Sequence, residues 1–268
     1  MTKHSAFTGS FLIILMFNIA YCSESSQPAD NGIVTIGIYA DSGAAVACVT
    51  AASNMFQWMG HEVFLMDADF INNKDLEHID IFYFPGGSPI PYTRNITYEG
   101  RKKIRKMIEK GCGYIGTCAG GIYAAEFQTW HGETYSAGQL GIFPGTAAGP
   151  IPQIYELPEI GMCQVNLNKF HQITGAEPDS LWIMYYNGPY FTPSNASRVD
   201  TIGTYEITGK VALVACEYGK GRVFLTGPHP EWEEDDDRDS ISYFDSHDDL
   251  GSDWTLMHSA VQWCLHED

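Results

Sequence analysis

The amino-acid sequence predicts an α/β fold with a doubly wound, mostly parallel sheet flanked by helices. Residues 33–39 form a nearly continuous apolar run, typical of a strand buried on both faces, and residues 43–59 then carry apolar residues at helical spacing. Strand-like and helix-like segments alternate through the first half of the chain, which favours parallel strands. With 268 residues, 44% of them hydrophobic, the chain is long enough to bury a full core and short enough to form one domain.

The remaining elements follow from the same patterns. Beyond the first strand and helix, we expect strands at residues 62–66, 79–84, 113–116, 181–186, 211–217 and 222–225, and helices at residues 97–110 and 253–266. The second half is less regular, and residues 139–152 are rich in Gly and Pro. In doubly wound sheets, sites form at the carboxyl ends of the strands, so residues that directly follow a strand are the first candidates.

The N-terminus has the features of an export signal. Lys3 precedes an apolar stretch at residues 11–20, which is too short to span a bilayer comfortably. Ala20 and Cys22 are small residues at the spacing of a signal-peptide cleavage site, which places the cut near Cys22-Ser23. We therefore expect a secreted or periplasmic protein, with an uncleaved signal anchor as the alternative. The predicted division of the chain is a signal peptide over residues 1–22, a polar leader over 23–31 and one folded domain over 32–268.

The charge and the cysteine content limit the partners of the protein. Asp and Glu number 33 against 15 Lys and Arg, and the formal charge of -18 opposes binding to phosphate backbones and anionic membranes. We expect no nucleic-acid partner and no stable membrane insertion after removal of the signal, and the oligomeric state stays open. In an oxidising compartment the six cysteines that follow Cys22 can form disulfides, but their spacing does not decide which of them pair.

No segment has the ligand spacing of a metal site. His61 and His171 are isolated, and His131 and Glu133 do not have the spacing of a zinc site. Residues 231–239 are acidic but lack the regular ligand spacing of an EF-hand loop. We expect a solvated loop there, with a loop that overhangs the site and repels anionic substrates as the alternative. Neither a metal nor an organic cofactor is expected.

The sharpest motif surrounds Cys118. Residues 116–121 read GTCAGG, directly after an apolar strand and at the start of a helical stretch. Small residues on both sides of a nucleophile allow a tight strand-to-helix turn, and the first N–H groups of the helix then favour a thiolate. A buried cysteine in an ordinary glycine turn is the alternative, since short motifs discriminate poorly.

His229 and Glu231 belong to a second motif. Residues 227–232 read GPHPEW and follow the predicted strand at residues 222–225. A histidine at this edge of the sheet can take the proton of a thiol, and a carboxylate two residues later can bind the other ring nitrogen and fix the tautomer. On its own, His229 would fit a capping or core position equally well.

Two glycines follow another predicted strand. Residues 83–88 read YFPGGS, in which Gly86 and Gly87 allow backbone N–H groups to approach a ligand closely. Together with the amide of Ala119, these groups could form an oxyanion hole, in which the loss of one donor typically raises the barrier by about 3 kcal/mol. A plain turn is the alternative.

The three motifs, in this order and each after a strand, resemble the class I glutamine amidotransferase superfamily. More narrowly, the chain resembles the amidotransferase-like domain at the N-terminus of biotin-protein ligases, and the resemblance spans roughly residues 32–266. The segments that carry the narrower resemblance are YADSGA at 39–44, YFPGG at 83–87, LGIFPG at 140–145, GP at 149–150 and YNGPYF at 186–191.

The resemblance implies a flavodoxin-like fold and a set of site residues. It implies Cys118 as nucleophile, His229 as base and Glu231 as its orienter. It further implies Gly87 and Ala119 as oxyanion donors, and Tyr186 and Asn187 are candidate substrate contacts. The elbow of the family continues to a glutamine that helps to hold the substrate, but Ile122 stands at that position. The resemblance therefore does not extend to glutamine recognition.

These observations predict an exported, stand-alone cysteine hydrolase. It would act on an amide C–N bond of a small molecule or a peptide, through Cys118, His229, Glu231 and a thioester intermediate. The alternative is a non-catalytic module that binds a small molecule or a peptide and retains a vestigial triad. A third interpretation, a redox-sensing thiol at Cys118, is disfavoured by the His229 partner.

Overall fold

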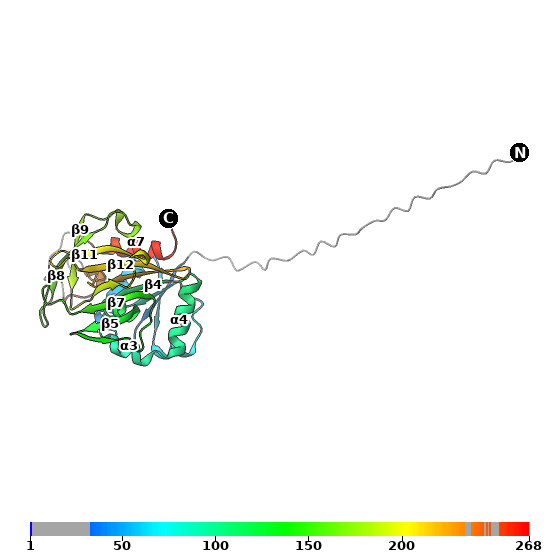
Figure 1. Cartoon of the computed structure of the whole chain (residues 1–268), viewed down its shortest axis with the longest axis horizontal. Coiled ribbons are helices and arrows are strands. Elements are labelled where there is room, and N and C mark those ends of the chain that lie inside the picture. The colour runs from blue at the N-terminus through cyan, green and yellow to red at the C-terminus, as the bar shows by residue number, and fades with distance from the viewer. Residues whose placement is uncertain (2–32, 234–236, 244, 246, 248–251, 268) are drawn as a thin grey trace. The chain divides into compact units, whose positions relative to one another are not determined.

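In the computed structural model, five parallel strands form one end of a large mixed sheet with helices packed around it (Figure 1). Their order across the sheet is β2 (Glu62–Met66), β1 (Thr35–Tyr39), β3 (Ile81–Phe84), β4 (Gly113–Thr117) and β13 (Gly221–Thr226). All five lie where the apolar runs of the sequence predict strands. The predicted flavodoxin-like α/β fold is therefore confirmed.

The structure describes residues 1, 33–233, 237–243, 245, 247 and 252–267. The chain separates into two units, Met1–Gly32 and Ile33–Asp268, and the fold lies in the second. The predicted signal peptide and polar leader, residues 1–22 and 23–31, lie outside the described residues apart from Met1. Among the described helices, none is long and apolar enough to cross a membrane.

Helices pack on both faces of the central strands. Side chains of α1 (Val46–Trp58) and α7 (Trp254–Cys264) share one core cluster with alternate residues of β3. Side chains of α4 (Tyr98–Lys110) share a second cluster with the intervening residues of β3. The shorter elements are α2 (Ala68–Asn73), α3 (Pro89–Asn95), α5 (Ala119–Ala124), α6 (Gln172–Gly175), η1 (Ala196–Arg198) and η2 (Asp237–Asp239). The parallel part of the sheet is thus covered on both sides, which explains why β3 is apolar on both faces.

The second half of the chain extends the sheet with mainly antiparallel strands. The sheet continues from β13 through β12 (Val211–Tyr218), β10 (Tyr190–Pro193), β7 (Phe143–Gly149), β5 (Ala125–Trp130) and β6 (Glu133–Tyr135). A branch leaves β12 through β11 (Val199–Tyr205), β8 (Gly161–Leu167) and β9 (Ser180–Tyr185). The sequence predicts β9 and β12. The other strands are not predicted, because they are short or carry Gly, Pro and polar residues between the apolar ones.

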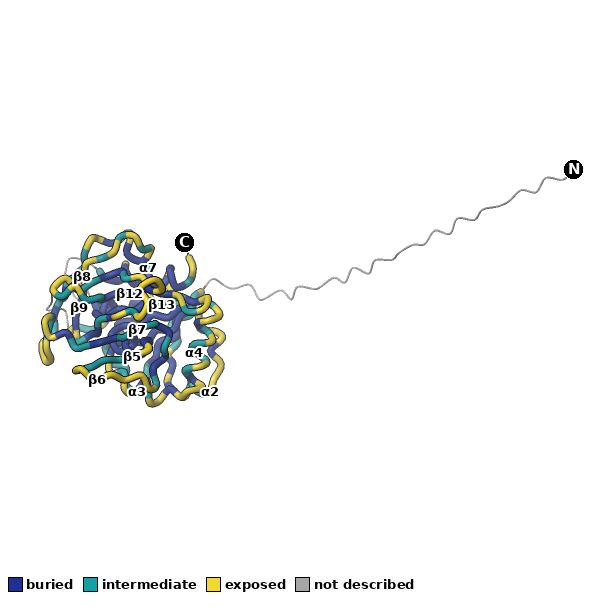
Figure 2. Tube along the Cα trace, viewed as in Figure 1, coloured by how far each residue is buried: buried dark blue, intermediate teal, exposed yellow. Residues whose placement is uncertain are grey.

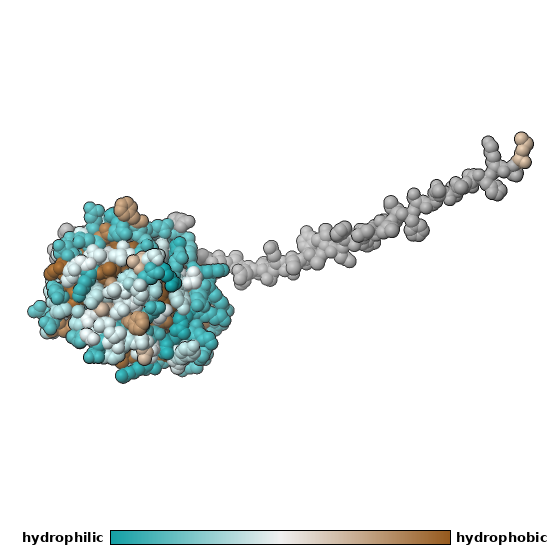
Figure 3. Space-filling view, viewed as in Figure 1, coloured by the Kyte–Doolittle hydropathy of each residue, from teal (hydrophilic) through white to brown (hydrophobic). Residues whose placement is uncertain are grey.

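Burial follows this layered arrangement. Figure 2 shows buried segments through the middle of the sheet and exposed segments mainly at the loops. β3 and β4 are buried along their whole length. The face seen in Figure 3 is largely hydrophilic with scattered apolar residues. The loops after β3, β4 and β13 therefore start from rigid, fully packed strand ends.

Candidate active site

Cys118 occupies a strained turn between β4 and α5. Its backbone angles are φ 48° and ψ -106°, in a region that residues other than glycine rarely adopt. Its backbone N–H donates to the carbonyl of Thr226 at 2.9 Å, at the end of the neighbouring strand β13. The strand-to-helix turn predicted from the GTCAGG motif is present, and the neighbouring strand helps to hold it in this conformation.

The glycines of the motif are required by close backbone packing. A Cβ on Gly120 would lie 1.8 Å from the carbonyl oxygen of Phe84 in β3, and a Cβ on Gly116 would lie 2.7 Å from the backbone of Gly120. Real Cβ atoms do not approach backbone atoms so closely, so a side chain at either position would push α5 away from the sheet. The glycines at positions 116 and 120 thus allow the close backbone packing that holds Cys118 in place.

His229 and Glu231 form a buried pair after β13. His229 Nδ1 donates to Glu231 Oε1 at 2.8 Å, and the two side chains are 2% and 0% exposed. The backbone N–H of His229 donates to the carbonyl of Met184 in β9 at 2.8 Å. Because a carboxylate can only accept, Nδ1 carries a hydrogen and Nε2 is left to exchange a proton with a reacting group. The predicted orienting contact is therefore present.

The environment of His229 favours its charged form. Burial is the largest single effect and lowers the pKa of His229, but the negative charge of Glu231 and the interactions with Cys118 and Cys48 together outweigh it. The net result is a pKa well above the ordinary value of 6.5. Protonated His229 is thus held between a carboxylate and two thiols, an arrangement that favours a thiolate beside it.

Trp232 and Trp254 fix the orientation of the pair. The Trp232 ring stacks on the His229 imidazole, with ring centroids 4.1 Å apart and an angle of 6° between the planes. The Trp254 indole N–H donates to the backbone carbonyl of Glu231 at 3.1 Å. A stacked indole stabilises a protonated imidazole. The sequence analysis missed the role of Trp232, although this residue directly follows Glu231.

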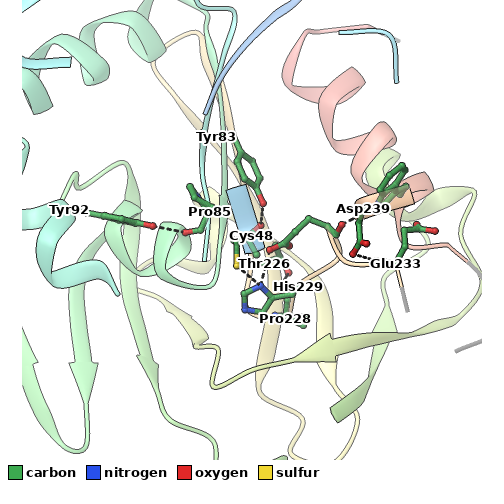
Figure 4. Close-up of polar contacts among 12 residues, drawn as sticks. Cys48, Tyr83, Pro85, Tyr92, Thr226, Pro228, His229, Glu233 and Asp239 are labelled. Carbon is green, nitrogen blue, oxygen red and sulfur yellow. Dashed lines mark hydrogen bonds and ion pairs between the residues drawn. The ribbon is translucent and has the colours of Figure 1, made fainter. Parts of the chain in front are cut away.

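Buried side-chain hydrogen bonds tie the loops that carry these residues to the fold (Figure 4). The Tyr92 hydroxyl donates to the carbonyl of Pro85 at 3.0 Å, and the Thr226 hydroxyl donates to the carbonyl of Pro228 at 2.8 Å. The Tyr83 hydroxyl donates to the Thr117 hydroxyl at 3.1 Å. The strand ends on either side of Cys118 are thus cross-linked by polar contacts.

Cys48 is a second thiol at the site, and the sequence did not predict it. It lies in α1, and its Sγ is 3.8 Å from His229 Nδ1 (Figure 4). Burial raises the pKa of Cys48 to about 12, so it stays a neutral thiol near neutral pH. Cys48, His229 and Glu231 offer ligand atoms within 4.8 Å of one another, and these three residues are the described group that could hold a metal ion. No sequence spacing links Cys48 to His229, 181 positions further along the chain.

The two glycines after β3 have different roles. A Cβ on Gly86 would lie 2.3 Å from His229 Cε1 and 3.0 Å from Cys48 Sγ, so Gly86 makes room for the imidazole. Gly87 has φ 138°, and its Cβ would lie 2.1 Å from the carbonyl oxygen of Gly43. Among the described residues, the Gly87 N–H has no backbone acceptor, which fits a free oxyanion donor. The missing side chain of Gly86 thus makes room for His229, and oxyanion donation by the two glycines stays a prediction.

A cavity of about 570 Å³ brings most of the predicted residues together. Those that line it are Gly87, Cys118, Ile122, Tyr186, Asn187 and His229. Ala119 is fully buried at the start of α5 and is not among the lining residues. Asn187 has φ 55° in a turn that the Tyr185 hydroxyl braces by donating to the carbonyl of Gly188 at 2.9 Å. Cys118 and the His229–Glu231 pair therefore meet at one solvent-connected site.

A parallel α/β sheet with a cysteine elbow after β4 and a His-Glu pair after β13 defines the class I glutamine amidotransferase-like fold. PurLQS from Thermotoga maritima has this fold, with a TM-score of 0.61 and 15% identity over 86% of this chain and 99% of that chain. A glutamine amidotransferase from the same organism gives a TM-score of 0.53 and 14% identity over 87% and 98%. At these identities the likeness shows the fold alone.

The family model for the N-terminal domain of biotin-protein ligase matches residues 34–261, and the chain belongs to this family. The biotin-protein ligase of Schizosaccharomyces pombe is 28% identical over 164 residues, which are 57% of this chain and 25% of the ligase. An uncharacterized protein of Chlamydia muridarum is 26% identical over 182 residues, which are 64% of this chain and 68% of that protein. The match thus spans about a quarter of the length of the yeast ligase, and the resemblance stated from the motifs is confirmed.

The substitution Gly86→Ala tests the packing of the base. Because the new Cβ would lie 2.3 Å from His229 Cε1, we expect the imidazole to move away from Glu231 and alkylation of Cys118 to slow. Gly175→Ala is the matched control, since its nearest contact would be 3.7 Å away. Thiol alkylation followed by mass spectrometry measures the rate. Equal rates in the two variants would show that Gly86 does not position His229.

The substitution Glu231→Gln tests the electrostatics. A raised pKa of His229 in the folded state stabilises the protein fully below pH about 6.5, and this contribution is lost as pH rises through the raised pKa. Since removal of Glu231 leaves the desolvation of His229 uncompensated, we expect unfolding to become easier by about 3 kcal/mol in mild acid. The loss should shrink in alkaline solution.

Denaturant unfolding at about pH 6 and about pH 9 measures this difference. Glu206→Gln, at an exposed carboxylate, is the matched control and should change little at either pH. A Glu231→Gln loss that is the same at both pH values would contradict the charge effect assigned to the pair.

Proposed function

We propose that this protein is a cysteine hydrolase that cleaves an amide C–N bond through a thioester. The observation that carries the proposal is the meeting, in one cavity, of the strained Cys118 elbow and a His229–Glu231 pair joined at 2.8 Å. A nucleophile, a base and an orienting carboxylate are the parts that such chemistry requires. No cofactor is needed for these steps.

The reaction follows from the positions of the groups. The Cys118 thiolate attacks the amide carbonyl, and the N–H groups of Gly87 and Ala119 stabilise the negative oxygen that forms. Protonated His229 gives its proton to the leaving nitrogen, so the C–N bond breaks and an amine departs. Neutral His229, oriented by Glu231, then takes a proton from water, which attacks the thioester. The C–S bond breaks, a carboxylic acid is released, and the Cys118 thiolate is restored beside protonated His229.

Export supports a hydrolase that works without a synthase partner. The residue pattern at 1–22 is that of a signal peptide, and an amide hydrolase needs water as its only second substrate. We propose that the protein acts as a stand-alone enzyme in a secreted or periplasmic location, on a small-molecule or peptide amide.

One observation favours a second candidate function. Two thiols contact the imidazole: Cys118 through a side-chain hydrogen bond, and Cys48, whose Sγ lies 3.8 Å from His229 Nδ1. Since Nδ1 is engaged with Glu231, the Cys48 contact does not provide a nucleophile and base pair, and it places a second thiol against the ring. A binding module that keeps the pocket without turnover is therefore the alternative. Contacts between catalytic groups often tighten only when substrate is bound, and we favour the hydrolase for that reason.

Alkylation of the reduced protein across pH distinguishes the two functions. We expect Cys118 to react with iodoacetamide at neutral pH, and His229→Ala to slow the reaction roughly ten-fold or more, since the imidazolium no longer stabilises the thiolate. His266→Ala, at an exposed histidine, is the control. Peptide mapping by mass spectrometry identifies the modified residue.

The substitution Cys48→Ala identifies which of the two thiols reacts. With a pKa of about 12, Cys48 should contribute no alkylation near neutral pH, so the variant should keep the wild-type labelling at Cys118. An inert Cys118, or one whose rate does not depend on His229, would leave the binding module as the better function.

A further inference from the structure

The cavity at Cys118 is lined almost entirely by uncharged side chains. Among the described residues, no Asp, Glu, Lys or Arg side chain lines it, and His229 is its one basic residue. The charge of Glu231 lies behind the imidazole at 0% exposure. A positively charged ligand group would thus lose its hydration without gaining an ion pair from these walls, which is unfavourable.

Apolar side chains form the inner walls of the cavity. Trp130, at the end of β5, lies on one side, and Ile122 and Trp232 lie close to the reacting groups. Gly149 in the neighbouring strand β7 keeps Trp130 in place, because a Cβ there would lie 2.4 Å from the indole ring. This wall is built on paired strands and not on a loop, so its shape is set before a ligand arrives.

Large apolar side chains that are exposed to solvent surround the mouth of the cavity. They come from α3, from the segment between β7 and β8, from the turn after β9 and from the segment after η2. These residues, with their exposed fractions, are Ile90 (50%), Leu157 (51%), Tyr186 (42%) and Tyr243 (70%). Single exposed apolar residues are ordinary on protein surfaces, but their convergence on one cavity is typical of a binding site for an apolar group.

The polar side chains that line the cavity can form hydrogen bonds with an amide group. Ser88, Gln128 and Asn187 can donate to a carbonyl or accept from an N–H, but none of them carries a charge. A free amino acid brings an ammonium and a carboxylate. The described lining offers the ammonium no carboxylate, and its one cation, the His229 imidazolium, is already paired with Glu231. We propose that the substrate is a neutral amide with an aromatic or branched aliphatic group, and that free glutamine is not a substrate. This inference rests on the proposed function of the same site.

Hydrolysis of two anilides compares the substrate classes directly. N-acetylphenylalanine p-nitroanilide presents a neutral apolar amide, and γ-glutamyl p-nitroanilide presents the charged end of glutamine. We expect kcat/KM for the first to exceed that for the second about ten-fold or more. Leu157→Ser and Trp130→Ala should each lower kcat/KM for the apolar anilide several-fold. Ile207→Ser and Trp182→Ala, which remove exposed side chains outside the cavity, are the matched controls and should leave it unchanged.

Binding to the full-length Cys118→Ala protein separates specificity from catalysis. Equilibrium dialysis with N-acetylphenylalanine amide and with glutamine should show binding of the first and much weaker binding of the second. If this holds but the wild type hydrolyses neither anilide, the inference on the ligand stands and the hydrolase proposal fails. If γ-glutamyl p-nitroanilide is the better substrate, the hydrolase stands and the inference is overturned. Equal binding of both ligands, or binding of neither, overturns it as well.

Discussion

Close backbone packing where β3, β4 and β13 end is the constraint on which the site depends. The Cys118 N–H donates to the carbonyl of Thr226, and Gly120 lies against the backbone of Phe84. Because the three strands are parallel neighbours, the segments that follow them emerge at one edge of the sheet. Cys118, His229 and the glycine turn after β3, which are far apart in the sequence, are thereby brought together at one edge of the sheet, with little freedom left in the backbone.

Because the site lies at the ends of these strands, part of the fold and of the site can be predicted from the sequence. The central strands are apolar on both faces, so their runs are visible, and Cys118, His229 and Glu231 are visible because each follows such a run. The residues that α1 and β5 contribute to the site could not be predicted in this way. Cys48 and Trp130 reach the cavity only through long-range packing, and no local pattern marks either residue as part of the site. Gly86 illustrates the same limit, because a local motif shows that a side chain is missing but does not show that His229 fills the space.

The buried pair illustrates the balance of energies at the site. Removing two charges from water is unfavourable by several kcal/mol for each ion, and a single hydrogen bond of 2.8 Å joins His229 to Glu231. Among the described residues, Glu231 Oε2 has no hydrogen-bond partner, so the carboxylate depends on the imidazolium for its stabilisation. The Trp232 ring on the other face of the imidazole adds a stacking contact and excludes water. The arrangement thus lowers stability while it holds a proton on the His229 imidazole.

The low polarity of the cavity affects both the pairing of His229 with Glu231 and the ligands that the cavity can bind. Apolar walls strengthen the attraction between His229 and Glu231, since charges interact more strongly away from water. Those walls also disfavour any ligand that brings an uncompensated charge into the cavity. A carboxylate on a ligand would in addition compete with Glu231 for the one imidazolium in the described lining. An uncharged amide, the substrate class that we propose, would avoid both effects. The negative charge that its carbonyl develops in a transition state would be stabilised by the N–H of Gly87, which has no backbone acceptor among the described residues.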